Sequence, residues 1–253
     1  MKYLHTSDLA RTAGVHANTV RRYVEWGLIP PVERGRNGYR LFTQRHLDCM
    51  RVARMVFMST YPGRAIRHSA SPIIQRAVAD DWGGALAQAH AHLAYVQSEQ
   101  AQAETAVMLL ERWAAGTAAA ASPRSLQIGQ VAKLLDISID VLRNWERNGL
   151  IAVPRDATNG YRHYGAVEIS RLRVIRMLSR AGYSQMAILR MMIQLDRGQT
   201  DNLRRSLDTP PPGEDIYSAA DRWLTTLADQ EQVAWRLIAL VKEIIDRRTP
   251  NRE

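Results

Sequence analysis

Apolar residues recur at alternating three- and four-residue steps along two long stretches of the chain, residues 77–116 and 217–249. This spacing predicts two long helices, each with a coiled-coil seam. The seams comprise Leu86, Ala89, Leu93, Val96, Ala103, Val107, Leu110 and Ala114 in the first helix and Leu224, Leu227, Ala234, Ile238, Val241 and Ile245 in the second. Each seam has one polar interruption near its middle, Gln100 and Glu231. Antiparallel pairing would bring these two side chains together, where they could set the register.

Shorter amphipathic stretches precede each long helix. Thr6 and Ser138 are candidate N-caps, Gly14 permits a turn, and Gly27 can end a helix. The pattern is typical of a helix-turn-helix that occurs twice. The four expected helices cover residues 6–13, 17–26, 129–135 and 138–148.

The chain contains an internal repeat. The tetrapeptide NGYR occurs at residues 37–40 and again at 159–162, an offset of 122 positions. The same offset aligns GLI with GLI at residues 27–29 and 149–151, and RVARM with RVIRM at residues 51–55 and 173–177, without a gap. An ungapped match of this length indicates a duplication.

Each NGYR follows a helix-turn-helix and lies in a short extended segment. Asn-Gly between extended segments favours a two-residue hairpin turn, so GRNGYRLF and ATNGYRHY each predict a small β-wing. The Tyr and Arg of the tetrapeptide should then emerge beside the second helix of the motif.

The second helix of each motif has a polar face. Val20 and Tyr23, and likewise Leu142 and Trp145, lie three residues apart and should face the core. Arg and Asn on the opposite face suit a DNA major groove, where Arg reads guanine and Asn reads adenine. The expected exposed residues are Ala17, Asn18, Arg21, Arg22 and Glu25 in the first copy and Ile139, Asp140, Arg143, Asn144 and Arg147 in the second.

The excess of positive over negative charge is confined to the two repeats. The net charge is +9; residues 1–70 have twelve Lys/Arg against four Asp/Glu, or +8, and residues 125–198 have eleven against six, or +5. Two basic blocks predict two contacts with a polyanion, although a solvated basic surface would have the same composition.

These residues resemble a known family. DLARTAGVHANTVRRYVEWGLIPP followed by NGYRLF, and GQVAKLLDISIDVLRNWERNGLI followed by NGYRHY, look like the N-terminal winged helix-turn-helix of MerR-type transcriptional regulators, over about 70 residues in each half. The resemblance implies DNA binding through the recognition helix and the wing. It also implies distortion of an overlong promoter spacer, which helps RNA polymerase engage both promoter elements.

The DNA-binding set that we predict combines the resemblance with the exposed helix and wing positions. One family feature differs between the copies, because the usual recognition-helix Glu is present as Glu146 but is replaced by Val24. Arg22 and Asn144 stand where the family often has an aromatic residue. The set comprises Asn18, Arg21, Arg22, Arg36, Tyr39, Arg40, Arg143, Asn144, Arg147, Tyr161 and Arg162.

We therefore expect a mainly α fold of tandem winged helix-turn-helix domains and two long helices. Family members pair through such a helix, and this chain has two, so we favour a monomeric pseudo-dimer whose helices form an antiparallel coiled coil. A homodimer with four DNA-binding modules is the alternative. The expected segments are a first module (1–76), first long helix (77–116), linker (117–124), second module (125–200), loop (201–216) and second long helix (217–249).

Four tryptophans in or beside the long helices could form a pocket for a small apolar effector: Trp82, Trp113, Trp223 and Trp235. They could equally pack the helices against the modules. His46 and Cys49 lie three residues apart, but no further ligand recurs nearby, so we expect no metal site and no cofactor.

The remaining patterns favour a non-enzymatic cytoplasmic protein. We find no signal peptide and no apolar run near the ~20 residues that span a bilayer. The sequence also contains no glycine-rich phosphate loop and no nucleophile motif. The predicted function is a transcriptional regulator that binds double-stranded DNA at an imperfect palindrome. The alternative is an architectural DNA-binding or recombination accessory protein.

Overall fold

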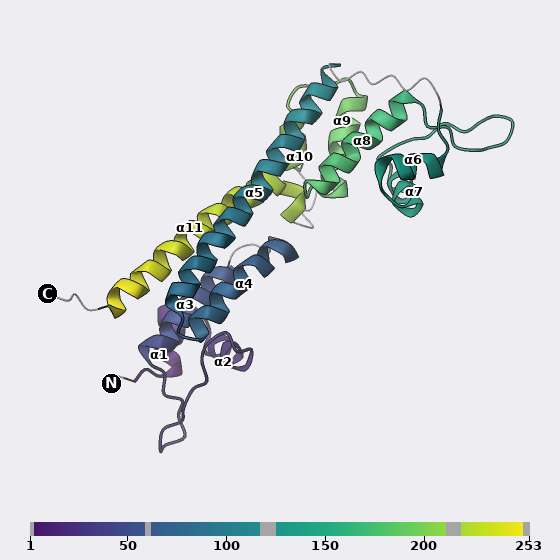
Figure 1. The fold of residues 1–253 in the computed structure, drawn as a ribbon. Helices are drawn as coiled ribbons and strands as arrows, with labels where there is room; N and C mark the ends of the chain where they lie inside the picture. The colour runs from purple at the N-terminus through teal and green to yellow at the C-terminus, as the bar shows by residue number, and fades with distance from the viewer. Residues whose placement is uncertain (1–2, 59–61, 117–124, 211–218, 250–253) are drawn as a thin grey trace. The chain divides into compact units, whose positions relative to one another are not determined.

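The computed structural model describes residues 3–58, 62–116, 125–210 and 219–249. These residues are mainly helical, and the predicted linker, residues 117–124, lies outside them. The helices, shown in Figure 1, are α1 Thr6–Ala13, α2 Ala17–Glu25, α3 Gln44–Met58, α4 Arg64–Val78, α5 Trp82–Ala114, α6 Ile128–Leu135, α7 Ile139–Arg147, α8 Ala166–Arg180, α9 Gln185–Asp196, α10 Leu203–Asp208, the 3₁₀ helix η1 Ala219–Arg222 and α11 Trp223–Arg248.

The chain divides into two compact units. The first contains residues 1–98 and 227–253, so it combines the first repeat with the beginning of α5 and most of α11. The second contains residues 99–226, which include the rest of α5, the second repeat and the start of α11. The long helices therefore each contribute to both units.

The turns of the helix-turn-helix motifs follow the sequence expectation with one correction. Gly14 and Gly27 both have positive φ, as does Asp136, which takes the place of Gly14 in the second copy. Ser138 Oγ accepts a hydrogen bond from the Val141 N–H (3.2 Å), so this N-cap is confirmed. Thr6 is not a cap; His5 precedes the helix, and its N–H donates to Asp8 Oδ2 (2.8 Å).

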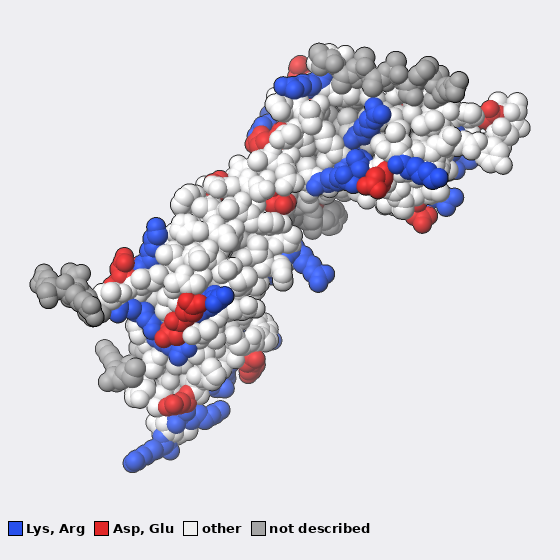
Figure 2. Space-filling model, viewed as in Figure 1, with Lys and Arg blue, Asp and Glu red and all other residues white. Residues whose placement is uncertain are grey.

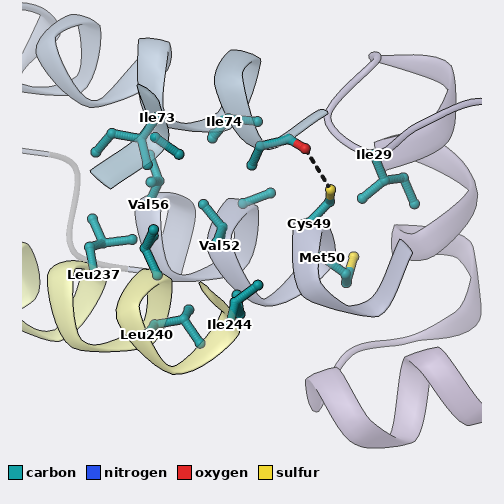
Figure 3. Close-up of a cluster of buried hydrophobic side chains, with 14 of the residues drawn as sticks. Ile29, Cys49, Met50, Val52, Val56, Ile73, Ile74, Leu237, Leu240 and Ile244 are labelled. Carbon is teal, nitrogen blue, oxygen red and sulfur yellow. Dashed lines mark hydrogen bonds between the residues drawn. The ribbon is translucent and has the colours of Figure 1, made fainter. Parts of the chain in front are cut away.

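The core of the first unit joins helices that are distant in sequence (Figure 3). Val52 and Val56 of α3, Ile73 of α4, and Leu237 and Ile244 of α11 are all buried in one cluster. Burying side chains of this size contributes roughly 1.5–3 kcal/mol each to folding. The end of α11 is thereby fixed to the first helix-turn-helix module.

Within the first unit, α5 and α11 lie antiparallel. Near the middle of α5, Gln97 Nε2 donates to Glu231 Oε1 of α11 (2.8 Å). At the other end of the pair, Arg248 NH1 of α11 lies 2.7 Å from Oδ1 of Asp80, which precedes α5. The Arg248 guanidinium also lies over the ring of Trp82, the first residue of α5. Residue numbers thus rise along one helix as they fall along the other. Gln100 was predicted to lie near Glu231; the residue that donates a hydrogen bond to Glu231 is Gln97, about one helical turn before Gln100.

In the second unit, hydrogen bonds from two indoles join the end of α5 to α8 and the start of α11 to the end of α8. Trp113 Nε1 donates to Ser170 Oγ of α8 (2.5 Å), and Trp223 Nε1 donates to the Ala181 carbonyl (2.8 Å). Gly182, with φ 96°, follows that carbonyl, and a Cβ there would lie 2.5 Å from Trp223 Nε1. The close approach of the indole therefore requires glycine at this position.

The two repeats differ in how they lead into their long helices. Three residues, 79–81, separate α4 from α5, whereas residues 197–222 separate α9 from α11 and include α10 and η1. Leu203 and Leu207 of α10 are buried, so α10 is packed onto the second unit. Among the described residues, no helix is both long and apolar enough to cross a bilayer.

Candidate DNA-binding interface

The second helix of each motif buries the face that was predicted. Val20 and Tyr23 of α2 are 0% and 7% exposed, and Leu142 and Trp145 of α7 are 1% and 4% exposed. Burying these positions fixes the rotation of each helix about its axis. The polar side chains of the opposite face must therefore point away from the core.

The exposed faces of α2 and α7 contain the predicted helix residues. Asn18, Arg21 and Arg22 are exposed, and the Arg22 guanidinium lies 6.0 Å from the centre of the exposed Trp26 ring. In α7, Arg143 pairs with Asp140 (3.5 Å). Asn144 is half-buried and accepts a hydrogen bond from Asn148 Nδ2, whereas Arg147 is exposed. On the face that Figure 2 shows, Lys and Arg side chains are scattered and interspersed with Asp and Glu.

Both NGYR segments form hairpins, but their turns differ from the predicted two-residue type. In the first, the Gly35 N–H donates to the Tyr39 carbonyl; in the second, the Asp156 N–H donates to the Tyr161 carbonyl (both 2.8 Å). The loops thus have three and four residues, and each hairpin has one antiparallel bridge, Arg34 to Arg40 and Arg155 to Arg162. A two-residue type I′ turn requires positive φ at Asn, which neither Asn37 nor Asn159 adopts.

The Asn of each tetrapeptide orders the backbone beside the exposed Tyr. Asn37 Oδ1 accepts a hydrogen bond from the Tyr39 N–H (3.3 Å), and Asn159 Oδ1 accepts one from the Tyr161 N–H (2.9 Å). Both tyrosine side chains are 66% exposed. Because an Asx turn uses the Asn side chain, the tetrapeptide encodes the loop as well as the residues it displays.

Two arginines that the sequence reasoning missed stabilise these loops. Arg34 NH1 donates to the Gly38 carbonyl (3.1 Å), and Arg155 NH1 donates to the Gly160 carbonyl (3.5 Å). They are 121 positions apart, one less than the repeat offset. The single-residue difference in loop length hides their equivalence from an ungapped alignment.

The base of the second wing is joined to the recognition helix. Arg162 Nε lies 2.7 Å from Glu146 Oε2, and Arg155 NH2 lies 4.0 Å from the other carboxylate oxygen. Arg40, the counterpart of Arg162, is half-buried and has no carboxylate partner among the described residues, because Val24 replaces the glutamate. Arg36, at the first loop, is exposed.

An aspartate further organises the second loop. Asp156 Oδ1 accepts hydrogen bonds from the Thr158 hydroxyl, the Thr158 N–H (2.8 Å) and the Asn159 N–H (3.1 Å). These bonds, led by the one from the hydroxyl, lower the pKa of Asp156 to about 2. At the repeat offset the first wing has Arg34 in place of this aspartate.

The four tryptophans of the predicted pocket are divided between the units. Trp82, 6% exposed, and Trp235, 51% exposed, belong to the first unit, and Trp82 Nε1 donates to Asp80 Oδ1 (2.9 Å). Trp113 and Trp223 belong to the second unit, where both indole N–H groups have the partners given above. Trp82 and Trp223 therefore pack the ends of the long helices in the way that the alternative reading expected.

His46 and Cys49 have separate structural contacts. Thr43 N–H donates to His46 Nδ1 (3.0 Å) at the start of α3, and His46 Nε2 lies 3.2 Å from the Pro31 carbonyl. The Cys49 thiol is buried and donates to the Ala77 carbonyl (3.4 Å), as Figure 3 shows. Burial raises the pKa of this thiol to about 12, which disfavours the thiolate that metals bind.

Comparison with known proteins finds family similarity in the two regions that contain the repeats. The family model described as MerR HTH family regulatory protein matches residues 4–69 and 126–195. The chain is 41% identical over 56 residues to the HTH-type transcriptional regulator CueR of Escherichia coli, which covers 21% of this chain and 42% of that protein. No solved structure shows a significant match.

Two further relatives are similar over slightly longer stretches. A probable heavy metal-dependent transcriptional regulator of Haemophilus influenzae is 32% identical over 71 residues, covering 28% of this chain and 56% of its own length. The mercuric resistance operon regulatory protein of Serratia marcescens is 30% identical over 74 residues, covering 29% and 51%. The chain thus spans about half the length of the relatives it matches or less. Since the family model matches both repeats and more than half of the residues, this chain belongs to the MerR family of helix-turn-helix regulatory proteins and contains two MerR-like domains.

Proposed function

We propose that the protein is a cytoplasmic, sequence-specific transcriptional regulator whose two modules bind successive major grooves of one DNA site. The observation that carries this proposal is the pair of recognition helices, α2 and α7, each with a buried apolar face, an exposed polar face and an adjacent wing. Family membership supports a regulator that binds DNA. In this arrangement Arg40 and Arg162 contact phosphates, whereas Arg21 and Arg143 reach base edges.

The two recognition faces predict an imperfect palindrome. Asn18 corresponds to Asp140, Arg22 to Asn144 and Glu25 to Arg147 at the repeat offset. Arg and Asn favour guanine and adenine, respectively, whereas Asp accepts a hydrogen bond from cytosine. The two half-sites should therefore differ at the base pairs that these positions contact.

One chain supplies both halves of the DNA-binding unit in this proposal. The Gln97–Glu231 and Asp80–Arg248 contacts support an intramolecular, antiparallel pairing of α5 and α11 as a coiled-coil pseudo-dimer. Cysteines in place of Gln97 and Glu231 should form a disulfide within one chain under oxidising conditions. A covalent dimer on a non-reducing gel, with no crosslinked monomer, would instead favour pairing between chains.

The mode of regulation that we propose is distortion of promoter DNA for RNA polymerase. Modules held about 34 Å apart would contact one face of the duplex, and bending or untwisting between them would realign the promoter elements. A footprint on a promoter combined with transcription in vitro tests this. Protection accompanied by a change in transcript level is expected. Protection at recombination sites, without any transcriptional effect, would instead favour an architectural protein.

Thiolate metal sensing does not form part of the proposal, although two relatives are named for heavy metal and mercury. The single cysteine of this sequence is buried, and the pKa of its thiol is raised to about 12. Any small apolar effector that the protein binds through its tryptophans would act without that thiol. Tryptophan fluorescence titration against apolar compounds tests for such a ligand.

A further inference from the structure

Residues of α9, of α10 and of the short segments on either side of α10 line a cavity in the second unit. Its volume is about 620 Å³, within the 300–1,000 Å³ that small-molecule sites commonly have. No residue of α7 or of the second wing lines it, so it is separate from the candidate DNA-binding residues. The lining residues are Arg190, Ile193, Gln194, Arg197, Gln199, Asn202, Arg205, Ser206, Thr209 and Pro210.

The lining is basic. Among the residues that the structure describes, it includes three arginines and no acidic residue. Arg197 and Arg205 are exposed, and neither guanidinium has a carboxylate partner among the described residues. Two neighbouring acidic groups have other partners: Asp196 forms a bidentate pair with Arg171 (2.5 and 2.8 Å), and Asp208 accepts hydrogen bonds from Thr225. A third, Asp201, is exposed, so the three arginines outnumber the one neighbouring carboxylate without a partner among the described residues. The cavity should therefore have a positive potential.

The walls of the cavity are fixed by contacts elsewhere in the unit. Leu203 and Leu207 anchor α10 in the interior, and Arg204 of the same helix pairs with Glu104 of α5. Arg190 NH2 donates to the Asp221 carbonyl (2.9 Å), and its Nε donates to the Ser206 carbonyl (3.4 Å). A site whose walls are already ordered loses less conformational entropy when a ligand binds.

We propose that this cavity binds a small polar metabolite with a phosphate or carboxylate group. Guanidinium groups recognise such oxyanions through paired, charge-assisted hydrogen bonds, and Arg197 and Arg205 are placed to provide them. Gln199, Asn202 and Thr209 add amide and hydroxyl groups that suit a hydroxylated ligand. Among the described lining residues, Ile193 and Pro210 are the apolar side chains.

Calorimetric titration of the full chain with inorganic phosphate, citrate and glucose 6-phosphate tests this proposal without DNA, so its outcome is independent of the function proposed above. At least one oxyanion should bind saturably, and uncharged glucose should not. Arg197→Gln combined with Arg205→Gln should weaken that binding at least roughly tenfold, because one charge-assisted hydrogen bond is a factor of about ten in affinity.

The matched control is Arg236→Gln combined with Lys242→Gln, which removes the same charge from exposed positions of α11. It should change oxyanion binding by less than about twofold. Circular dichroism shows whether each variant is folded. The proposal would be overturned if none of the three oxyanions bound saturably, or if the two double variants lost oxyanion affinity equally. A loss of DNA affinity in the cavity variant without oxyanion binding would also overturn it, because the arginines would then belong to the DNA contact.

Discussion

The two modules share a helical frame but differ in how their wings are held. Val20 and Leu142 are buried at equivalent positions of α2 and α7, and Asn37 and Asn159 order equivalent turns. At the base of the wing, by contrast, Arg162 is paired with Glu146, whereas the position equivalent to Glu146 in the first copy is Val24, which cannot pair with Arg40. The buried positions of the two modules are therefore alike, whereas the charged contacts at their surfaces differ.

This difference indicates that the copies have distinct electrostatic roles. Arg40 can direct its full charge at a phosphate, whereas the charge of Arg162 is partly neutralised by Glu146. A dimer of identical chains must present two identical faces, whereas a duplicated chain is free of that symmetry. The two copies differ in sequence at positions of the wings and recognition helices.

The largest effect is expected from substitutions at the buried helix position that the two modules share. Leu142→Ala should lower the free energy of unfolding by about 2–5 kcal/mol, because it removes a buried side chain and leaves a cavity. Val20→Ala removes fewer atoms and should cost about 2 kcal/mol. Urea denaturation measures both. Leu134→Ala is the control, since Leu134 is 50% exposed; an equally small effect for Leu142 would contradict the shared core.

Removing the wing arginines tests their DNA contact. Arg40→Ala should weaken binding to any duplex roughly tenfold and reduce the salt slope by about 0.9. Arg162→Ala should weaken binding more, because it also leaves Glu146 with only its 4.0 Å contact to Arg155 beside the DNA backbone. Fluorescence anisotropy at several salt concentrations provides both quantities. Unchanged affinity in both variants would show that the wings do not contact DNA.

Exchanging the residues at positions 24 and 146 tests how the ion pair at the base of the second wing affects DNA binding. Glu146→Val should strengthen DNA binding by about threefold, because it frees Arg162, and Val24→Glu should weaken it by a similar factor; exposed ion pairs are worth about 1 kcal/mol or less. A double-mutant cycle between positions 146 and 162 isolates their coupling. Additive effects in that cycle would mean that the pair has no influence on the complex.

The smallest expected effect concerns pH. The pKa of Asp156 is lowered to about 2, chiefly by the Thr158 hydroxyl, from an ordinary value of 3.8. The ordered second loop is therefore favoured above about pH 4 and loses this contribution only as the pH falls toward 2. The Thr158 amide NMR signal should stay constant from pH 6 to about pH 3. Titration near pH 3.8, as for an unbonded carboxyl, would contradict these hydrogen bonds.

Much of the modules could be predicted because local rules determine them. The three-residue spacing of Val20 and Tyr23 placed the buried face of α2, and the Ser138 N-cap placed the start of α7. Both features depend on neighbours within one or two turns of a helix. The exposed recognition residues then followed from the buried ones.

The other features depend on three-dimensional packing, which the spacing of apolar residues along the chain does not specify. The apolar seam recurs with each turn of the helix. The sequence pattern therefore could not decide whether Gln97 or Gln100 is the partner of Glu231. The wing loops differ by one residue, which concealed the equivalence of Arg34 and Arg155. The cavity depends on the packing of α10, whose six residues are too few for a periodic signal.

The central claim is that a single chain reads one asymmetric DNA site with two different modules. Selection of bound sequences from random duplex DNA, followed by light scattering of the complex with the selected duplex, tests this most directly. We predict an imperfect palindrome, with half-sites centred about one helical turn apart and one chain per duplex. A perfect palindrome bound by two chains would contradict the claim.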